Sequence, residues 1–190
     1  MGAKVYVVET NSVRALEAQM QGYNVVSAKT LAGIADLIIT VTGNKHVISK
    51  DLFPIMKDGI ILANAGHFDV EIDLEYLSTN SDSVKNVREN VESYKYEGRE
   101  IFVIGEGRLV NLVASTGHPA SVMDMSFANQ ALAAKWIKDN HETLENIVYI
   151  LPKEVDQEIA RKKLLLMGGE LQSLSDEQKE YLTSWEFGTS

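Results

Sequence analysis

The sequence predicts an α/β fold in which part of a doubly wound parallel sheet is followed by a helical carboxy-terminal region. Over roughly the first 80 residues, short apolar runs alternate with helical stretches, the pattern of parallel strands joined by crossover helices. One run, Leu-Ile-Ile-Thr-Val at positions 37–41, lacks the polar alternation of a half-exposed strand. After Pro119 only helical periodicity remains.

The first elements expected are a strand and a helix. Lys4–Glu9 is rich in β-branched and aromatic residues, which favours a strand. Asn11 or Ser12 is suited to cap a helix that ends near Gly22, because a side-chain oxygen there accepts from free amides of the first turn. The apolar residues of that helix recur at helical spacing at Val13, Leu16 and Met20.

Four further segments complete the alternation. A short strand is expected near Asn24–Ser27 and a helix around Thr30–Ala35. Leu37–Val41 is expected to be a strand buried on both faces. A helix around Ser49–Met56 then leads to a largely apolar strand over Gly59–Ala65.

The pattern then changes to an edge extension. Val84–Tyr96 is polar and alternating, and Glu100–Ile104 follows after a glycine, so the two should form an antiparallel ribbon. Arg108–Ala114 is a further apolar, strand-like stretch.

Three helices are expected in the carboxy-terminal region. The longest covers about Ala120–Asn140. A second begins at Pro152 and runs to Met167, before a Gly-Gly break. The last, near Asp176–Ser184, is capped by Ser175.

Composition excludes several classes of partner. Eighteen basic and 27 acidic residues give a net charge of −9, which repels phosphate backbones, so no nucleic-acid partner is expected. The apolar runs are too short to cross a bilayer, so no membrane partner is expected either. The absence of cysteine excludes disulfides and thiolate metal sites and fits a cytoplasmic location.

The position of Glu9 indicates an incomplete Rossmann-like sheet. In that fold a glycine loop follows the first strand, and an acid about 20 residues later binds a ribose hydroxyl of the dinucleotide. Counting back about 20 residues from Glu9 ends before Met1, so the first strand and its glycine loop should be lacking. Gly105-Glu-Gly-Arg-Leu-Val110 begins like such a loop, but Val110 would obstruct it, and a turn is expected there.

Several longer stretches together resemble S-adenosylhomocysteine hydrolase. They occur in that family's order and spacing and correspond to its later half: Glu9–Ala18, Asn64–Asp73, Glu106–Leu112, Gly117–Pro119, Met125–Gln130, Leu151–Asp156 and Glu180–Leu182. The resemblance implies an NAD-dependent enzyme that reversibly splits S-adenosylhomocysteine into adenosine and homocysteine, its expected small-molecule partners. In that chemistry NAD oxidises the substrate ribose and later restores it, while the protein orients groups and moves protons.

The resemblance also assigns cofactor-binding residues. Glu9 matches the acid on the adenosine-side ribose of NAD, and Arg14 matches a position near the same ribose. Thr42 and Gly43 end a strand and should pass close to the cofactor. Asn111 resembles the residue that holds the nicotinamide carboxamide, for which a side-chain amide offers both a donor and an acceptor.

Two histidines are the candidate catalytic residues. Ala65, Gly66 and His67 match the segment near the nicotinamide and substrate ribose, so these three are also expected to bind the cofactor. His118 resembles a hinge histidine that faces the substrate, although a Gly-His-Pro turn also has a purely conformational interpretation.

Other polar and aromatic residues receive structural interpretations. His46 and His141 lie outside any matching motif, and Asn64 could simply cap backbone at a strand end. In the carboxylate group Asp69, Glu71 and Asp73, Asp73 is interpreted as a helix cap and the others as solvated, with no metal. Trp136 and Trp185 are interpreted as packing residues.

The expected organisation has three parts. Residues 1–117 form an incomplete NAD-binding domain, residues 118–150 a hinge and a helix that would pack on a substrate domain, and residues 151–190 a tail for homo-oligomerisation. The isolated chain is expected to be inactive. The alternative is a non-catalytic truncated module for oligomerisation or regulation of the intact enzyme. A hydroxyacid dehydrogenase would share the sheet but not the His-Phe-Asp and Met-Ser-Phe-Ala-Asn-Gln segments.

Overall fold

The computed structural model, which describes residues 2–185, begins with a small β-α-β unit. β1 (Tyr6–Val7) pairs in parallel with β2 (Asn24–Val25), and α1 (Ser12–Met20) connects them. The Asn11 side chain accepts hydrogen bonds from two amides of the first turn of α1, as the cap prediction required. The three elements are confirmed, with shorter strands, but the apolar helix residues are 59–79% exposed: Val13, Leu16 and Met20.

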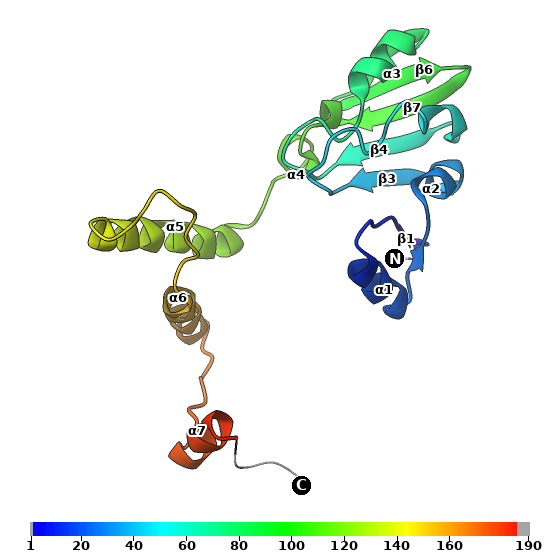
Figure 1. Cartoon of the computed structure of the whole chain (residues 1–190). Coiled ribbons are helices and arrows are strands. Elements are labelled where there is room, and N and C mark those ends of the chain that lie inside the picture. Colours follow the sequence, from blue (N-terminus) through cyan, green and yellow to red (C-terminus); the bar gives the residue numbers. More distant parts are fainter. Residues whose placement is uncertain (1, 186–190) are drawn as a thin grey trace. The chain divides into compact units, whose positions relative to one another are not determined.

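A five-stranded mixed sheet follows, in the order β3-β4-β7-β6-β5 (Figure 1). β3 (Leu37–Thr40), β4 (Ile60–Asn64) and β7 (Arg99–Ile104) are parallel. β6 (Val91–Tyr96) pairs antiparallel with β7 and with β5 (Ser83–Arg88). The predicted α/β fold and antiparallel ribbon are therefore confirmed.

The ribbon contains one more turn than the sequence pattern indicated. The segment expected to run from Val84 to Tyr96 is divided between β5 and β6 by a turn in which Asn90 has φ of +57°. Asparagine tolerates this left-handed conformation better than most residues with a Cβ. The Asn90 carbonyl also accepts a hydrogen bond from the Gly105 amide at 2.8 Å.

The hydrophobic core lies on one face of this sheet. It is covered by α2 (Ala28–Ile34), the 3₁₀ helix η1 (Phe53–Ile55) and α3 (Leu74–Asn80) (Figure 1). Phe53 is fully buried and its ring stacks on that of Tyr76, with centroids 6.1 Å apart. Other core side chains come from the strands and helices alike: Ala32, Ile38, Ile60, Leu62, Leu77, Ile101 and Val103.

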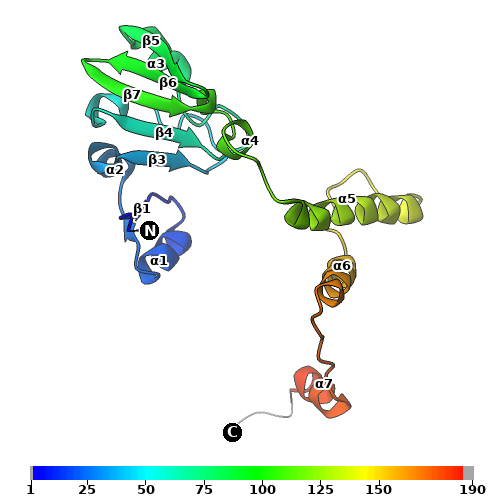
Figure 2. The same ribbon diagram turned by 180° about the vertical axis from the view of Figure 1, so that it is seen from behind.

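The opposite face of the sheet is open. Leu37 and Ile39 of β3 are 49% and 53% exposed, and Ile61 of β4 is 37% exposed. The prediction that Leu37–Val41 is buried on both faces is wrong, because α2, η1 and α3 all pack on the side of Ile38 (Figure 2).

Two local predictions also fail. The helix expected over Ser49–Met56 is reduced to η1, in which Pro54 occupies a first-turn position and donates no amide hydrogen bond. Arg108–Ala114 is not strand-like: it contains the one-turn helix α4 (Val110–Val113). The expected turn before it is confirmed as the 3₁₀ helix η2 (Gly105–Gly107).

A second compact unit begins at His118 and is helical. Its helices are α5 (Ala120–Asn140), α6 (Lys153–Leu166) and α7 (Asp176–Thr183), as predicted. Ser175 and Gln178 form a reciprocal capping box at the start of α7. No helix in the described part of the chain is both long and apolar enough to span a membrane.

This second unit has little core of its own. Among its described residues, Ile159 is the one buried hydrophobic side chain. Lys163 of α6 forms an ion pair with Asp124 of α5 at 2.7 Å. Trp136 packs against Tyr149, which confirms its packing role, but Trp185 is 90% exposed, so the same prediction for Trp185 is wrong.

Candidate functional site

Most of the predicted cofactor residues lie at the carboxyl ends of the parallel strands β3, β4 and β7. Because β3, β4 and β7 run in the same direction, the turns that follow them lie at one edge of the sheet, beside α4 (Figure 1). Thr42 and Gly43 follow β3, and Ala65–His67 follow β4. The Ala65 amide donates to the Thr40 carbonyl at 2.8 Å, so the turn after β4 is bonded directly to the end of β3.

Asn64, the last residue of β4, is the buried centre of this edge. Its side-chain oxygen accepts from the Thr40 hydroxyl at 3.1 Å and from the Gly66 amide at 2.6 Å. Its side-chain nitrogen donates to the carbonyls of Phe68 and Gly107, both at 2.8 Å. The interpretation as a backbone cap is therefore confirmed, and one amide joins the turns after β4 and β7 to the end of β3.

Glu71 departs from its prediction. It was expected to be solvated, but only 1% of its surface is exposed. Its Oε2 accepts from the Thr42 hydroxyl at 2.7 Å and the Thr42 amide at 3.0 Å, while Oε1 accepts from the Gly43 amide at 2.7 Å. Burial alone would raise the pKa of this carboxyl, but the three hydrogen bonds together hold its pKa below the ordinary value.

These contacts limit how the turn after β3 can meet a ligand. The Thr42 hydroxyl donates to Glu71 and accepts from the Asn44 amide at 3.1 Å. The amides of Thr42 and Gly43 are also occupied by Glu71. The turn can therefore contact a ligand through its carbonyl oxygens rather than through these amides. Carbonyl oxygens accept from a hydroxyl or amine group of a ligand, whereas a phosphate needs donors.

His67 is presented outward by the turn after β4. The residue is exposed, and its ring makes an edge-to-face contact with Phe68, with centroids 4.6 Å apart. Gly66 beneath it is buried. An exposed imidazole at a strand end is placed to exchange a proton with a bound ligand.

Asn111 lies at the same edge of the sheet, in the segment that follows β7. Asn64 forms an isolated parallel bridge with Leu109, two residues before Asn111 in the chain. Asn111 itself is half-buried in α4, and its carbonyl accepts from the Gly117 amide at 2.9 Å.

Glu9 and Arg14 belong to the separate two-stranded sheet. Glu9 follows β1, and its Oε1 accepts from the Thr10 and Asn11 amides at 2.6 and 2.8 Å. The Asn11 amide, followed by the Thr10 amide, lowers the pKa of Glu9, and nearby Arg14 adds to this effect. Glu9 is thus favoured as a carboxylate, and within the described chain its hydrogen bonds all use Oε1.

The other three histidines differ in their surroundings: His118 stays a candidate site residue, whereas His46 and His141 each contact a neighbouring polar group. His118 is exposed and is the first residue of the second unit. His46 lies 3.7 Å from Asp73, and Nδ1 of His141 lies 2.8 Å from the Lys138 carbonyl.

The carboxylates near Asp73 do not form a metal centre. Asp73 caps α3 by accepting from the Tyr76 amide at 3.2 Å, as predicted. Asp69 is exposed, whereas Glu71 is occupied by Thr42 and Gly43. The described residues contain no group of three or more His, Cys, Asp or Glu side chains arranged for a metal ion.

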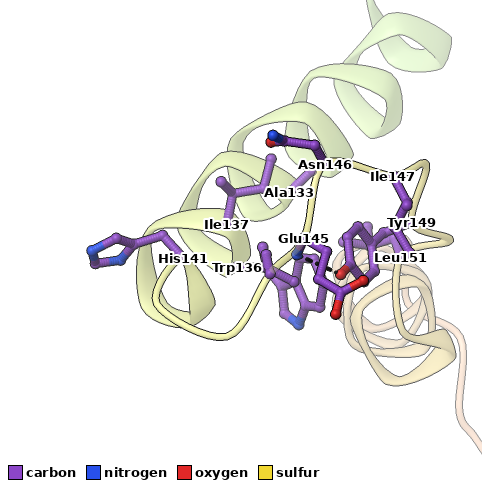
Figure 3. A pocket seen from close by; sticks show the side chains of 10 residues that line it. Ala133, Trp136, Ile137, His141, Glu145, Asn146, Ile147, Tyr149 and Leu151 are labelled. Carbon is purple, nitrogen blue, oxygen red and sulfur yellow. Dashed lines mark hydrogen bonds between the residues drawn. The ribbon is translucent and has the colours of Figure 1, made fainter.

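A pocket in the second unit contains none of the predicted site residues (Figure 3). It lies between the end of α5 and the loop before α6, where the Tyr149 hydroxyl accepts from the Glu145 amide at 2.8 Å. Its walls are mainly apolar: Ala133, Trp136, Ile137, Leu144, Ile147, Tyr149 and Leu151, with His141, Glu145 and Asn146. Its titratable side chains are His141, whose Nδ1 lies 2.8 Å from the Lys138 carbonyl, and Glu145, and neither belongs to a predicted motif, so the strand-end site remains the candidate.

The strand-end groups suit the nucleoside parts of NAD. Glu9 retains Oε2 as an acceptor for a ribose hydroxyl, and Asn111 carries a carboxamide that can match that of nicotinamide. A pyrophosphate would need free amides or cations, and the amides of Thr42 and Gly43 are occupied.

Comparison with known proteins shows which proteins the chain is similar to. Residues 1–117 match the family model described as S-adenosyl-L-homocysteine hydrolase, NAD binding domain. Over the whole chain, the sequence is 53% identical to an adenosylhomocysteinase of Pyrococcus abyssi and 50% identical to one of Aquifex aeolicus. It is also 50% identical, over 99% of its length, to an S-inosyl-L-homocysteine hydrolase of Methanococcus maripaludis.

The matches cover only part of each relative. The chain spans 45% of the Pyrococcus abyssi protein, 46% of the Aquifex aeolicus protein and 45% of the Methanococcus maripaludis protein. The region matched by the family model ends at Gly117, where the first compact unit also ends.

Proposed function

The chain belongs to the S-adenosyl-L-homocysteine hydrolase family, with NAD as its cofactor, and from that membership we propose that it forms part of an enzyme that reversibly hydrolyses S-adenosylhomocysteine to adenosine and homocysteine. One observation carries the proposal. Asn64 and Glu71 join the turns at the strand ends and present Ala65, Gly66 and His67 there, inside the segment that matches an NAD-binding domain.

The proposed roles follow from the chemistry of each side chain. NAD, when bound, supplies the oxidation and re-reduction of the substrate ribose. Glu9 accepts from a ribose hydroxyl, and its charge disfavours a 2′-phosphate, with Arg14 beside it. Asn111 orients the carboxamide, while His67 and His118 hold or transfer protons.

We expect the isolated 190 residues to be inactive. No G-x-G-x-x-G segment occurs in them, and the described amides at the ends of β3 are already hydrogen-bonded. Since a free helix or loop amide is what normally holds the pyrophosphate, NAD+ should bind more weakly than about millimolar.

A hybrid enzyme tests the proposal. The part of Pyrococcus abyssi adenosylhomocysteinase that precedes the match is joined to residues 1–190, and homocysteine release is followed with a thiol reagent. We expect the hybrid, but not the isolated chain, to hydrolyse S-adenosylhomocysteine. His67→Asn should lower this rate about a hundredfold, as is typical for loss of an acid–base group, whereas His141→Asn should not.

Two results would contradict the proposal. Turnover by the isolated chain would show that it needs no further cofactor contacts. A folded hybrid that binds NAD+ but hydrolyses S-inosylhomocysteine in place of S-adenosylhomocysteine would assign the substrate of the Methanococcus maripaludis relative instead.

A second candidate is a non-catalytic module for homo-oligomerisation or regulation of the intact enzyme. Exposed apolar side chains of the second unit favour it: Val148 and Ile150 are 96% and 92% exposed, and Leu166 and Met167 are 86% and 76% exposed. Light scattering of the 190-residue chain should then show an oligomer that Val148→Ser with Leu166→Ser dissociates. A monomer at every protein concentration would exclude self-assembly.

A further inference from the structure

Backbone hydrogen bonds fix the segment that carries Glu71 beside the carboxyl ends of the strands, independently of the contacts of the Glu71 side chain. The His46 amide donates to the Val70 carbonyl at 2.8 Å, and the Ile48 amide donates to the Glu71 carbonyl at 3.0 Å. The Asp73 amide returns a bond to the Ile48 carbonyl at 2.9 Å. The segment therefore cannot move away from the strand ends without breaking a short parallel pairing.

The Glu71 side chain then reaches two turns at once. Its carboxylate accepts three hydrogen bonds from Thr42 and Gly43, in the turn after β3. The same carboxylate lies against Gly66, in the turn after β4: a Cβ atom there would be 1.9 Å from Oε1. Gly66 is fixed in turn by the bond from its amide to Asn64.

The contacts require a carboxylate rather than any polar side chain. Three donors converge on two oxygens, so a glutamine would aim an NH₂ group at either the Thr42 or the Gly43 amide. No lysine, arginine or histidine within the described residues forms an ion pair with Glu71, so the charge is stabilised by these dipoles alone. A buried charge with this arrangement is costly unless every bond is kept.

We propose that Glu71 is a positioning residue of the cofactor site: it sets the Thr42–Gly43 turn against the Ala65–His67 turn in the geometry that receives NAD. This rests on the proposed function. Glu71 is too deeply buried to meet the cofactor itself, and acts through the residues that it holds. By occupying the amides of Thr42 and Gly43, it also makes this turn a site for the hydroxyl or amine groups of the nucleosides rather than for phosphate.

Nuclear magnetic resonance of the ¹⁵N-labelled 190-residue chain tests both whether Glu71 holds the Thr42–Gly43 turn and whether that turn contributes to NAD binding. We expect Glu71→Gln to make the Thr42 and Gly43 amides exchange with solvent at least about tenfold faster, while core amides stay protected. Titration with NAD+ into the tens of millimolar should give a Kd about tenfold higher for the variant. Glu75→Gln is the matched control, since it removes the same charge from an exposed position on α3.

A second pair of variants covers the case in which Glu71→Gln does not fold. Thr42→Val removes the hydroxyl bond to Oε2 together with the bond from the Asn44 amide, and Thr42→Ser restores both. We expect faster Gly43 exchange and a weaker NAD+ response for the valine variant, with recovery for the serine variant.

The outcomes separate this inference from the proposed function. If Thr42 and Gly43 exchange is unchanged in Glu71→Gln and Thr42→Val, Glu71 does not position the turn. If exchange rises but the Kd for NAD+ is unchanged, Glu71 is structural only, and the inference is overturned while NAD binding stands. If NAD+ shifts no resonance of these turns in the unsubstituted chain, the turns do not receive NAD and the inference is overturned, whereas hydrolysis by the hybrid enzyme decides the proposed function separately.

Discussion

Gly66 and Glu71 are packed so closely that a Cβ atom at position 66 would lie 1.9 Å from Oε1 of Glu71. The glutamate carboxylate occupies the space that any other residue type would need at position 66. The Gly66 amide is bonded to Asn64, and the carboxylate to Thr42 and Gly43, so neither group has room to withdraw.

Gly66→Ala should therefore destabilise the first unit. Overpacking of a tightly packed site costs about 1–3 kcal/mol, and we expect that loss in the free energy of unfolding measured with urea. Gly33→Ala is the matched control, because its Cβ would meet only the Ile55 carbonyl at 3.9 Å and alanine favours the α2 helix. Equal stability of the two variants would show that the Glu71 carboxylate can move aside.

Asn64→Ala should remove the centre of the hydrogen-bond network. Asn64 is fully buried, and its loss leaves the Phe68 and Gly107 carbonyls and the Gly66 amide without their partner. Each unsatisfied buried group costs about 1–3 kcal/mol, so the unfolding midpoint should fall clearly. Asn86→Ala, on the exposed strand β5, should change it little. Similar midpoints for both variants would argue that water replaces the Asn64 amide.

Glu71 should make the first unit sensitive to acid. Its pKa in the folded chain lies below the ordinary value of 4.5, so the unfolded chain takes up the proton first as the pH falls. The stabilisation by the carboxylate is thus complete well above pH 4.5 and is lost as the pH falls through the folded pKa.

Urea unfolding between neutral pH and the acid range measures this effect. We expect stability to fall more steeply below pH 4.5 in the unsubstituted chain than in Glu71→Gln, with Glu75→Gln behaving like the unsubstituted chain. Parallel pH profiles for the chain and Glu71→Gln would mean that Glu71 titrates normally.

Hydrogen exchange should divide the chain into a protected and an unprotected part. Fifteen buried hydrophobic residues form the core around β3, β4, β6 and β7, whereas the second unit buries Ile159 alone among its described residues. Amides of the inner strands should thus exchange through global unfolding, and those of α5–α7 much faster. Equal protection of α5 and β4 would indicate that self-association buries the helices, which dilution would reveal.

The sequence predicted the elements whose signals are local. The long helix Ala120–Asn140 follows a proline and repeats its apolar residues over many turns, and its limits were predicted correctly. The caps Asp73 and Ser175 were predicted, and Asn11 was one of two candidates with Ser12, because capping depends on residues only two or three positions away.

The failures concern contacts made across the fold. Glu71 was expected to be solvated because its partners, Thr42 and Gly43, are distant in sequence and nothing in its own segment indicates them. The burial of Glu71, though not its partners, had one signal in the sequence, because Glu71 stands between the β-branched apolar residues Val70 and Ile72. The apolar run of β3 likewise indicates burial, but no helix of the first unit covers Leu37 or Ile39. The roles of the predicted site residues stay predictions.

β7 pairs antiparallel with β6 on one side and parallel with β4 on the other, and this difference determines the order in which the strands of the sheet can form. On one side of β7, Tyr96 faces Arg99 across a tight hairpin, whereas on the other side Ile101 faces Ile60, which is far away along the chain. Closing short loops costs less entropy than closing long ones, so the antiparallel meander should fold first and serve as a template for β4 and then β3. Pulsed hydrogen-exchange labelling during refolding should protect Tyr94 and Ile101 before Ile38, leaving the turns that carry the site as the last part to be ordered.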